Sequence, residues 1–261
     1  MKLKTVSYET EEHVAIISLE RPDDMNAFNA QMRADFVKAQ QAAENDDKIR
    51  VVIITGSGRA FSAGTDLKES ESSASTDGAF DNSIRDYKPL IDGITRSPKI
   101  YIAAINGFAG GVALGMALGA DLAVMADNAI VFSPFTDIGL VPDGGASFHL
   151  YLGMGYKRAF AAIAECTRLD AKTCFEMGMI NKIVPNDKLM DETKAWAHSL
   201  SKRAPLALSY SKKILRSLPG LDSEAAARLE SEYQNRCANS EDAGAAIKAF
   251  ITKSKPTFKG R

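Results

Sequence analysis

Two short apolar runs, RVVIIT at residues 50–55 and KIYIAAI at residues 99–105, constrain the fold of this chain most strongly. Neither run alternates polar with apolar residues, and such runs are typical of strands that are buried on both faces of a parallel sheet. Each run leads into a glycine-rich turn, and segments with helical spacing lie between the strands. This alternation predicts an α/β fold with ligand sites at the turns beyond the strand ends.

Other segments extend this pattern on both sides. Residues 4–10 and 13–20 are predicted to be strands, and residues 30–46 a helix. DLAVMAD and AIVFS are two further short strands, and another helix is expected from about Ala146. Residues 68–83 are polar and low in complexity, which predicts a mobile loop.

The last third of the chain is predicted to be helical from about Asn186, with breaks at Pro205 and at residues 218–220. It ends in KSKPTFKGR, a basic segment with one aromatic residue. We expect residues 1–200 to form the core domain and residues 201–261 a separate helical region.

Composition excludes several classes of protein. The chain has 261 residues, 45% of them hydrophobic, and a formal net charge of −1, so nothing drives it generally toward nucleic acid or acidic membranes. The longest apolar run, residues 107–120, is shorter than the roughly 20 residues that span a bilayer, and we expect a buried helix there. An odd cysteine count without a CxxC pair and an N-terminus without a signal segment favour the cytoplasm. The three histidines are too scattered to predict a metal site.

Two glycine-rich turns, AFSAGTDL and INGFAGGVAL, are the first candidates for chemistry. Both expose backbone N–H groups, and the second opens a helix whose positive end favours developing negative charge. Together they could aim two N–H groups at one oxygen and so form an oxyanion hole, although tight packing alone would also explain the glycines. GSGRAF lacks the third glycine of a dinucleotide-binding turn, and GASFH lacks the last glycine of a serine-hydrolase elbow.

These two turns, together with RPDDMNAFN, FTDIGLVPDGG and KSKPTFKGR, resemble the crotonase superfamily of enoyl-CoA hydratases and isomerases in order and spacing. The resemblance implies a spiral of ββα turns followed by a helical C-terminal trimerisation region, with trimers that commonly pair into hexamers. It also implies an acyl-CoA thioester as substrate and no separate cofactor. The matching oxyanion donors are the backbone N–H groups of Thr65 and Val112.

The resemblance also separates possible reactions. Hydratases of the superfamily carry two glutamates, and the matching positions here are Gly115 and Phe135, or Thr136 if the loop is shifted by one. Isomerases carry one acidic residue just after the proline of the later turn, which matches Asp143. Because a single carboxylate can take a proton from C2 and return it at C4, the resemblance implies an enoyl-CoA isomerase.

A local alternative for Asp143 is an N-cap of the helix that starts at about Gly144, a role worth about 1 kcal/mol. Asp137 and His149 are nearby polar residues whose roles are left open. Asp66 follows Thr65 directly and is expected to order the loop. Hydration through Asp143, dehalogenase-like chemistry and a non-catalytic acyl-CoA-binding protein are the alternative functions, and the acyl group itself is not predicted.

The resemblance also places the CoA moiety. The residues that it implies are Met25, Ala27, Ala63, Asp66 and Leu67, with Lys255 and Phe258 contributed from the C-terminal segment, often by a neighbouring subunit. A lysine can meet a phosphate as a point charge, and an aromatic ring can cover the adenine. A solvated basic tail is the alternative for the last two.

Overall fold

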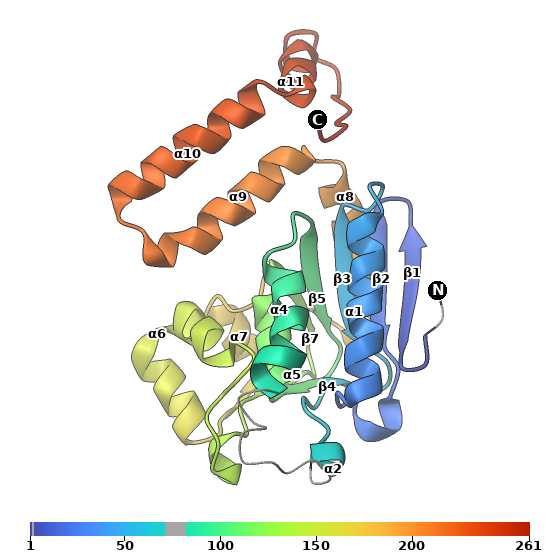
Figure 1. The fold of residues 1–261 in the computed structure, drawn as a ribbon, viewed down its shortest axis with the longest axis vertical. Coiled ribbons are helices and arrows are strands. Elements are labelled where there is room, and N and C mark those ends of the chain that lie inside the picture. Colours follow the sequence, from blue (N-terminus) through green and yellow to red (C-terminus); the bar gives the residue numbers. More distant parts are fainter. Residues whose placement is uncertain (2, 71–81) are drawn as a thin grey trace.

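The structure, a computed structural model, describes residues 1, 3–70 and 82–261 as two sheets wound into a spiral and followed by helices (Figure 1). The larger sheet has the strand order β1-β2-β3-β5-β7-β10. Its first two strands pair antiparallel and the others are parallel. The strands are β1 (Val6–Glu11), β2 (Val14–Leu19), β3 (Val51–Gly56), β5 (Ile100–Ile105), β7 (Leu122–Ala126) and β10 (Lys182–Val184).

The smaller sheet has the order β4-β6-β8-β9 and is assembled from very short strands. These are β4 (Ala60–Ser62), β6 (Phe108–Gly110), β8 (Ile130–Phe132) and β9 (Arg168–Asp170). Each turn of the chain therefore gives one strand to each sheet, as β3 and β4, β5 and β6, and β7 and β8 do, before a helix follows. The expected crotonase-like spiral of ββα turns is confirmed.

The helices of the spiral follow the strands in sequence. They are α1 (Ala30–Asn45), α2 (Leu67–Ser70), α4 (Lys88–Thr95), α5 (Val112–Gly119), α6 (Ala146–Ala164), α7 (Ala171–Glu176) and α8 (Leu189–Ser201). The ends of the segment predicted to be a loop are helical, as α2 and the π-helix η3 (Asn82–Tyr87). Residues 71–81 of that segment lie outside the described residues.

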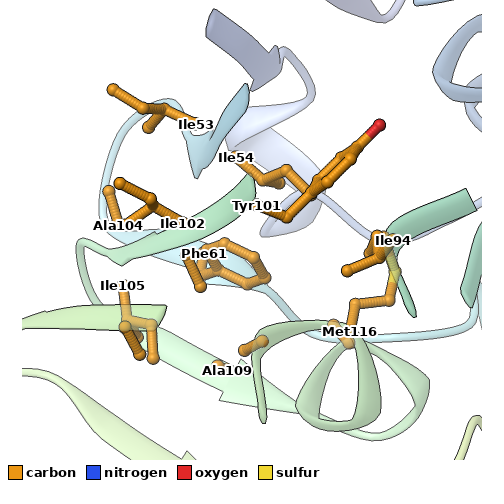
Figure 2. Packing of buried hydrophobic residues seen from close by; sticks show 14 of the residues in the cluster. Ile53, Ile54, Phe61, Ile94, Tyr101, Ile102, Ala104, Ile105, Ala109 and Met116 are labelled. Atoms are coloured by element: carbon orange, nitrogen blue, oxygen red, sulfur yellow. The ribbon is translucent and has the colours of Figure 1, made fainter. Parts of the chain in front are cut away.

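The core lies between the two sheets and the helices that cover them. All six residues of β3 are buried, as the uninterrupted apolar run predicts. Figure 2 shows the Phe61 ring of β4 in the middle of this core, surrounded by residues of β5, β6 and α5. Burying a large apolar side chain fully is worth roughly 1.5–3 kcal/mol, so this cluster fixes the strand ends from which the functional turns emerge.

The C-terminal helices extend from one end of the spiral (Figure 1). They are α9 (Pro205–Ser217), α10 (Ser223–Ala238) and α11 (Glu241–Ile251). The final residues turn back to the core, where the Arg50 guanidinium donates to the carbonyl oxygens of Ser201 (2.9 Å) and Phe258 (2.7 Å). No helix among the described residues is long and apolar enough to span a membrane.

Candidate active site

The two glycine-rich turns meet after the ends of β4 and β6. Gly64 has a φ of +92°, and a Cβ atom built on it would lie 2.8 Å from the Gly110 oxygen and 3.1 Å from the Val112 nitrogen. A side chain would therefore force the turns apart, and only glycine adopts this φ without strain. The sequence places glycine here so that the Thr65 and Val112 peptides can lie close together.

Both candidate donors are free to bind a ligand. The Phe28 N–H donates to the Gly64 oxygen (2.7 Å) and the Asp66 N–H donates to the Phe28 oxygen (3.1 Å), so the intervening Thr65 peptide faces away from Phe28. Val112 is the first residue of α5, where the helix provides no acceptor for the N–H. Within the described part of the chain, neither N–H has a hydrogen-bond acceptor. This is the arrangement that an oxyanion hole requires.

The Asp143 turn packs directly on the start of α5. A Cβ atom on Gly144 would lie 2.6 Å from the Val112 Cγ2 atom, and one on Gly115 would lie 2.0 Å from the Gly144 oxygen. The backbone beside Asp143 thus touches the helix that carries the second candidate donor, Val112. Asp143 and Val112 are 31 positions apart in the sequence but neighbours in the fold.

Asp143 is not the cap of a helix. Helix α6 begins at Ala146, its N-cap is Gly145, and no side chain hydrogen-bonds to its first turn. The local alternative, in which Asp143 caps this helix, is therefore excluded. Gly144 and Gly145 both have positive φ, so the chain makes a left-handed turn between Asp143 and the helix, and the contact to the Ala146 N–H (3.0 Å) comes from the Asp143 carbonyl.

The Asp143 carboxyl group is electrostatically unusual. Burial raises its pKa above the ordinary aspartate value, and a hydrogen bond from its own backbone N–H only partly offsets this. Its Oδ1 atom is buried and, among the described residues, has no hydrogen-bond partner. A buried carboxylate oxygen without a donor is costly, and such groups are frequent at sites that transfer protons.

The positions that the resemblance matches to the two hydratase glutamates hold no carboxylate. Gly115 packs on the Gly144 backbone, and Phe135 is 7% exposed. The Thr136 hydroxyl donates to the Ile163 oxygen (2.8 Å) and lies 2.9 Å from the Cys166 Sγ atom. Asp137 is exposed in the short 3-10 helix η4 (Thr136–Ile138).

Five residues implied for CoA binding lie along the Thr65 loop. The Ala63 N–H donates to the Met25 oxygen (2.9 Å), which joins the Met25–Ala27 segment to the loop. Asp66 accepts from the Arg21 guanidinium (2.9 Å) and from the Lys68 N–H (3.2 Å), and therefore orders the loop as expected from its position. Leu67 is 56% exposed at the start of α2.

The other two implied residues lie elsewhere in their own chain. The Phe258 carbonyl binds Arg50, which stands directly before the first residue of β3. Thr65 lies beyond the other end of β3, because β4 connects that end to the Thr65 loop. Figure 1 shows the C-terminus at one end of the molecule and α2, next to Thr65, at the other. Within one chain, the C-terminal segment therefore lies far from the Thr65 loop.

His149 lines a cavity of about 860 Å³ between α4, α6 and α9. Burial, with a smaller contribution from Arg216, lowers the pKa of His149 to about 4, so its imidazole is neutral at pH 7. Its Nε2 atom would lie 3.0 Å from a Cβ atom on Gly119, the last residue of α5, so glycine leaves room for the imidazole. In residues 1, 3–70 and 82–261, no three His, Cys, Asp or Glu side chains are grouped so that they could hold a metal ion.

Two residues near the site were not predicted from the sequence. Arg59 lines a cavity of about 550 Å³ together with Met25, Asn106 and Asn186. Tyr87, at the end of η3, is 4% exposed, and its hydroxyl donates to the Phe28 oxygen (3.4 Å). Tyr87 lies in no recognisable motif, and only the folded chain brings it to Phe28, which pairs with Thr65.

Comparison with known proteins agrees with this geometry. The profile of the enoyl-CoA hydratase/isomerase family matches residues 9–261. A probable enoyl-CoA hydratase of Rhodobacter capsulatus is 33% identical over all of both chains, and a 1,2-epoxyphenylacetyl-CoA isomerase of Escherichia coli is 32% identical over 96% of this chain and 97% of its own. A solved structure of a putative enoyl-CoA hydratase/isomerase from Mycobacterium abscessus superposes with a TM-score of 0.92 at 31% identity, covering 98% of this chain and all of that one. The chain therefore belongs to the enoyl-CoA hydratase/isomerase family.

Proposed function

We propose that this protein is an enoyl-CoA isomerase in which Asp143 moves a proton from C2 to C4 of a 3-enoyl-CoA. The observation that carries the proposal is the half-buried Asp143 side chain. Its Oδ1 atom is buried and unpartnered among the described residues, and its turn lies beside the helix that presents the Val112 N–H. The positions of both hydratase glutamates lack a carboxylate.

The proposed reaction needs one base and one electrophilic site. The Thr65 and Val112 N–H groups donate to the thioester oxygen, and each such donor is typically worth about 3–4 kcal/mol in the transition state. Asp143 takes the C2 proton, and the electron pair moves into the thioester enolate. Because burial favours the neutral carboxylic acid, the proton is held until it returns at C4 and the double bond closes between C2 and C3. Atoms and charge balance without water.

The proposal also covers CoA binding, the oligomeric state, the cofactor requirement and the location of the enzyme. The CoA moiety lies along Met25, Ala27, Ala63, Asp66 and Leu67, with Arg59 as the basic group for a phosphate. The active form is a homotrimer or hexamer in which Lys255 and Phe258 serve a neighbouring copy. No cofactor is needed beyond the CoA of the substrate, and the enzyme works in the cytoplasm. Turnover after dialysis against EDTA tests the cofactor statement, and cell fractionation tests the location.

The direct test is Asp143→Asn. We expect isomerisation of a 3-enoyl-CoA to fall by about a thousandfold or more, because the general base is lost, while calorimetric binding of a saturated acyl-CoA is unchanged. Asp137→Asn is the matched control, since Asp137 is exposed nearby, and it should retain full turnover. Undiminished turnover in Asp143→Asn would refute the assignment.

A second candidate is an enoyl-CoA hydratase that activates water through Asp143. It is favoured by names among the relatives, which include a short-chain-enoyl-CoA hydratase of Clostridium acetobutylicum at 30% identity. A panel of 2-enoyl, 3-enoyl and aromatic-ring CoA esters separates the candidates. Hydration of crotonyl-CoA at a rate comparable with isomerisation would support the hydratase, and binding without solvent deuterium exchange at C2 would indicate a non-catalytic acyl-CoA-binding protein.

A further inference from the structure

Tyr87 is a buried hydroxyl group at the site to which the proposed reaction gives no role. It lies at the junction of η3 and α4, far in sequence from Phe28 and Thr65, and it is 4% exposed. Its hydroxyl donates to the Phe28 oxygen (3.4 Å), and the Thr65 side chain acts on this hydroxyl as a hydrogen-bond donor that lowers the Tyr87 pKa. The same hydroxyl thus contacts both segments that orient the Thr65 peptide.

Phe28 holds both peptides that flank the Thr65 Cα atom. Its N–H donates to the Gly64 oxygen (2.7 Å), which lies in the same planar peptide as the Thr65 N–H, and its carbonyl accepts from the Asp66 N–H (3.1 Å), in the next peptide. Rotation of the Phe28 peptide would turn the Thr65 peptide with it. A shift of a few tenths of an ångström at this donor matters, because oxyanion holes act through fixed geometry.

A second side chain reaches the same carbonyl from another helix. The Arg33 guanidinium on α1 donates to the Phe28 oxygen (3.4 Å), and its Cζ atom lies 5.5 Å from the centre of the Tyr87 ring. Arg33 also pairs with Asp86 (3.4 Å), next to Tyr87. Arg33 and Tyr87 therefore hold the Phe28 carbonyl between α1 and the η3–α4 junction.

The Tyr87 hydroxyl keeps its proton at neutral pH. Burial is the main cause that raises the pKa of Tyr87, and the Thr65 side chain and the Arg33 charge offset it only in part. A hydroxyl that stays protonated can donate throughout the range in which Asp143 works.

We propose that Tyr87 is a positioning residue of the oxyanion hole, whose hydroxyl fixes Phe28 and Thr65 so that the Thr65 N–H points at the thioester oxygen. The inference rests on the proposed function. It adds that the η3–α4 junction, and not only the two glycine-rich turns, determines how strongly the thioester is polarised.

The test is Tyr87→Phe, read by infrared spectroscopy of bound butyryl-CoA that is isotope-labelled at the thioester carbonyl. This saturated ester cannot isomerise, so the readout depends on the hydrogen bonds to its oxygen and not on the reaction. In the wild type we expect the carbonyl stretch to move to lower frequency on binding, and in Tyr87→Phe to return part of the way to the free value. In turnover of a 3-enoyl-CoA, kcat should fall by about tenfold while KM stays within about threefold.

Tyr101→Phe is the matched control, because Tyr101 is also buried and its hydroxyl meets Glu44 (3.4 Å). It should leave the carbonyl stretch unchanged. Thr65→Val keeps the backbone N–H and removes the hydroxyl that Tyr87 contacts, so its effect on the stretch should not add to that of Tyr87→Phe in the double variant. It also serves as the second variant if Tyr87→Phe does not fold.

The outcomes separate the two proposals. A wild-type shift that Tyr87→Phe or Thr65→Val leaves unchanged overturns the role of Tyr87 alone. A shift that both variants reduce, in an enzyme that does not isomerise 3-enoyl-CoA, supports the role of Tyr87 and overturns the isomerase assignment. A wild type that binds butyryl-CoA without any shift overturns the role of Tyr87 together with the oxyanion hole.

Discussion

At the scale of single residues, the absence of a side chain at Gly115 shapes this site as much as the Asp143 carboxylate does. Gly115 occupies the position of the first hydratase glutamate, and the Gly144 backbone fills the space where its Cβ atom would be. The Asp143 turn therefore lies against α5 only because position 115 has no side chain. A Gly115→Glu substitution would displace Asp143 and would not install a second carboxylate beside it.

We expect Gly115→Ala to lower the free energy of unfolding by about 1–3 kcal/mol and to reduce turnover severely. The added Cβ atom would lie 2.0 Å from the Gly144 oxygen, so backbone must move and Asp143 moves with it. Urea denaturation and turnover of a 3-enoyl-CoA measure the two effects. Gly244→Ala in α11 is the control, because a Cβ atom there meets nothing within 4 Å, and it should be neutral or slightly stabilising.

The raised pKa of Asp143 predicts how activity and stability depend on pH. Since the base must be ionised, the acid limb of kcat/KM should lie above the ordinary aspartate pKa. A folded-state pKa above the unfolded one favours the folded state at low pH, and this contribution is lost as pH rises through the folded pKa. Asp143→Asn should therefore be more stable than the wild type at pH 7, by a margin that disappears in acid. Equal urea midpoints at both pH values would contradict this.

Sequence patterns identify these residues but not their geometry. Thr65, Val112 and Asp143 could be named because glycine-rich turns and the residues around Pro142 keep a fixed spacing. The sequence does not show that Gly144 and Gly145 form a left-handed turn before α6. The helix could therefore be expected to start at about Gly144, with Asp143 as its cap. Tyr87 could not be found at all, since its burial depends on Arg33 and Phe28 from a distant segment.

At the scale of elements, long periodic or fully apolar segments were predictable and very short ones were not. The runs 51–54 and 100–105 became β3 and β5, and the predicted C-terminal helices are present as α8 to α11. Three-residue strands such as β4 and β9 carry no periodicity, and pairing across the sheet defines them. The path of the final residues could not be predicted either, because it is set by hydrogen bonds to the Asp242 carboxylate and the Arg50 guanidinium.

Asp242 fixes the C-terminal segment to α11. Its buried carboxylate accepts from the Lys259 N–H (2.6 Å) and the Gly260 N–H (2.8 Å). We expect Asp242→Ala to release the last residues, seen as faster hydrogen exchange at Lys259 and Gly260 and faster carboxypeptidase trimming. Glu241→Ala is the control, since that exposed side chain lies 3.5–3.6 Å from basic groups of the same segment. Exposed ion pairs contribute little, so it should behave like the wild type.

At the scale of the whole molecule, large apolar side chains are exposed on two helices. They belong to α6 and α11, and the most exposed are Tyr156, Phe160, Ile247, Phe250 and Ile251. Exposed apolar surface of this extent is typical of an interface. The separation of Phe258 from Thr65 within one chain is consistent with this, because the proposed role of Phe258 in CoA binding requires a second copy.

We expect the protein to elute at three times the 28.1 kDa chain mass, or six times if trimers pair, in light-scattering chromatography. Phe250→Asp should shift it toward the single-chain mass, because burying a charge in an apolar interface is unfavourable. Ala245→Asp adds the same charge to the opposite face of α11 and is the control. If Lys255 and Phe258 serve a neighbouring copy, Phe250→Asp should also weaken acyl-CoA binding although it lies far from Thr65 in its own chain. A monomeric variant with unchanged affinity would confine the CoA site to one chain, and a monomeric wild type would exclude the trimer.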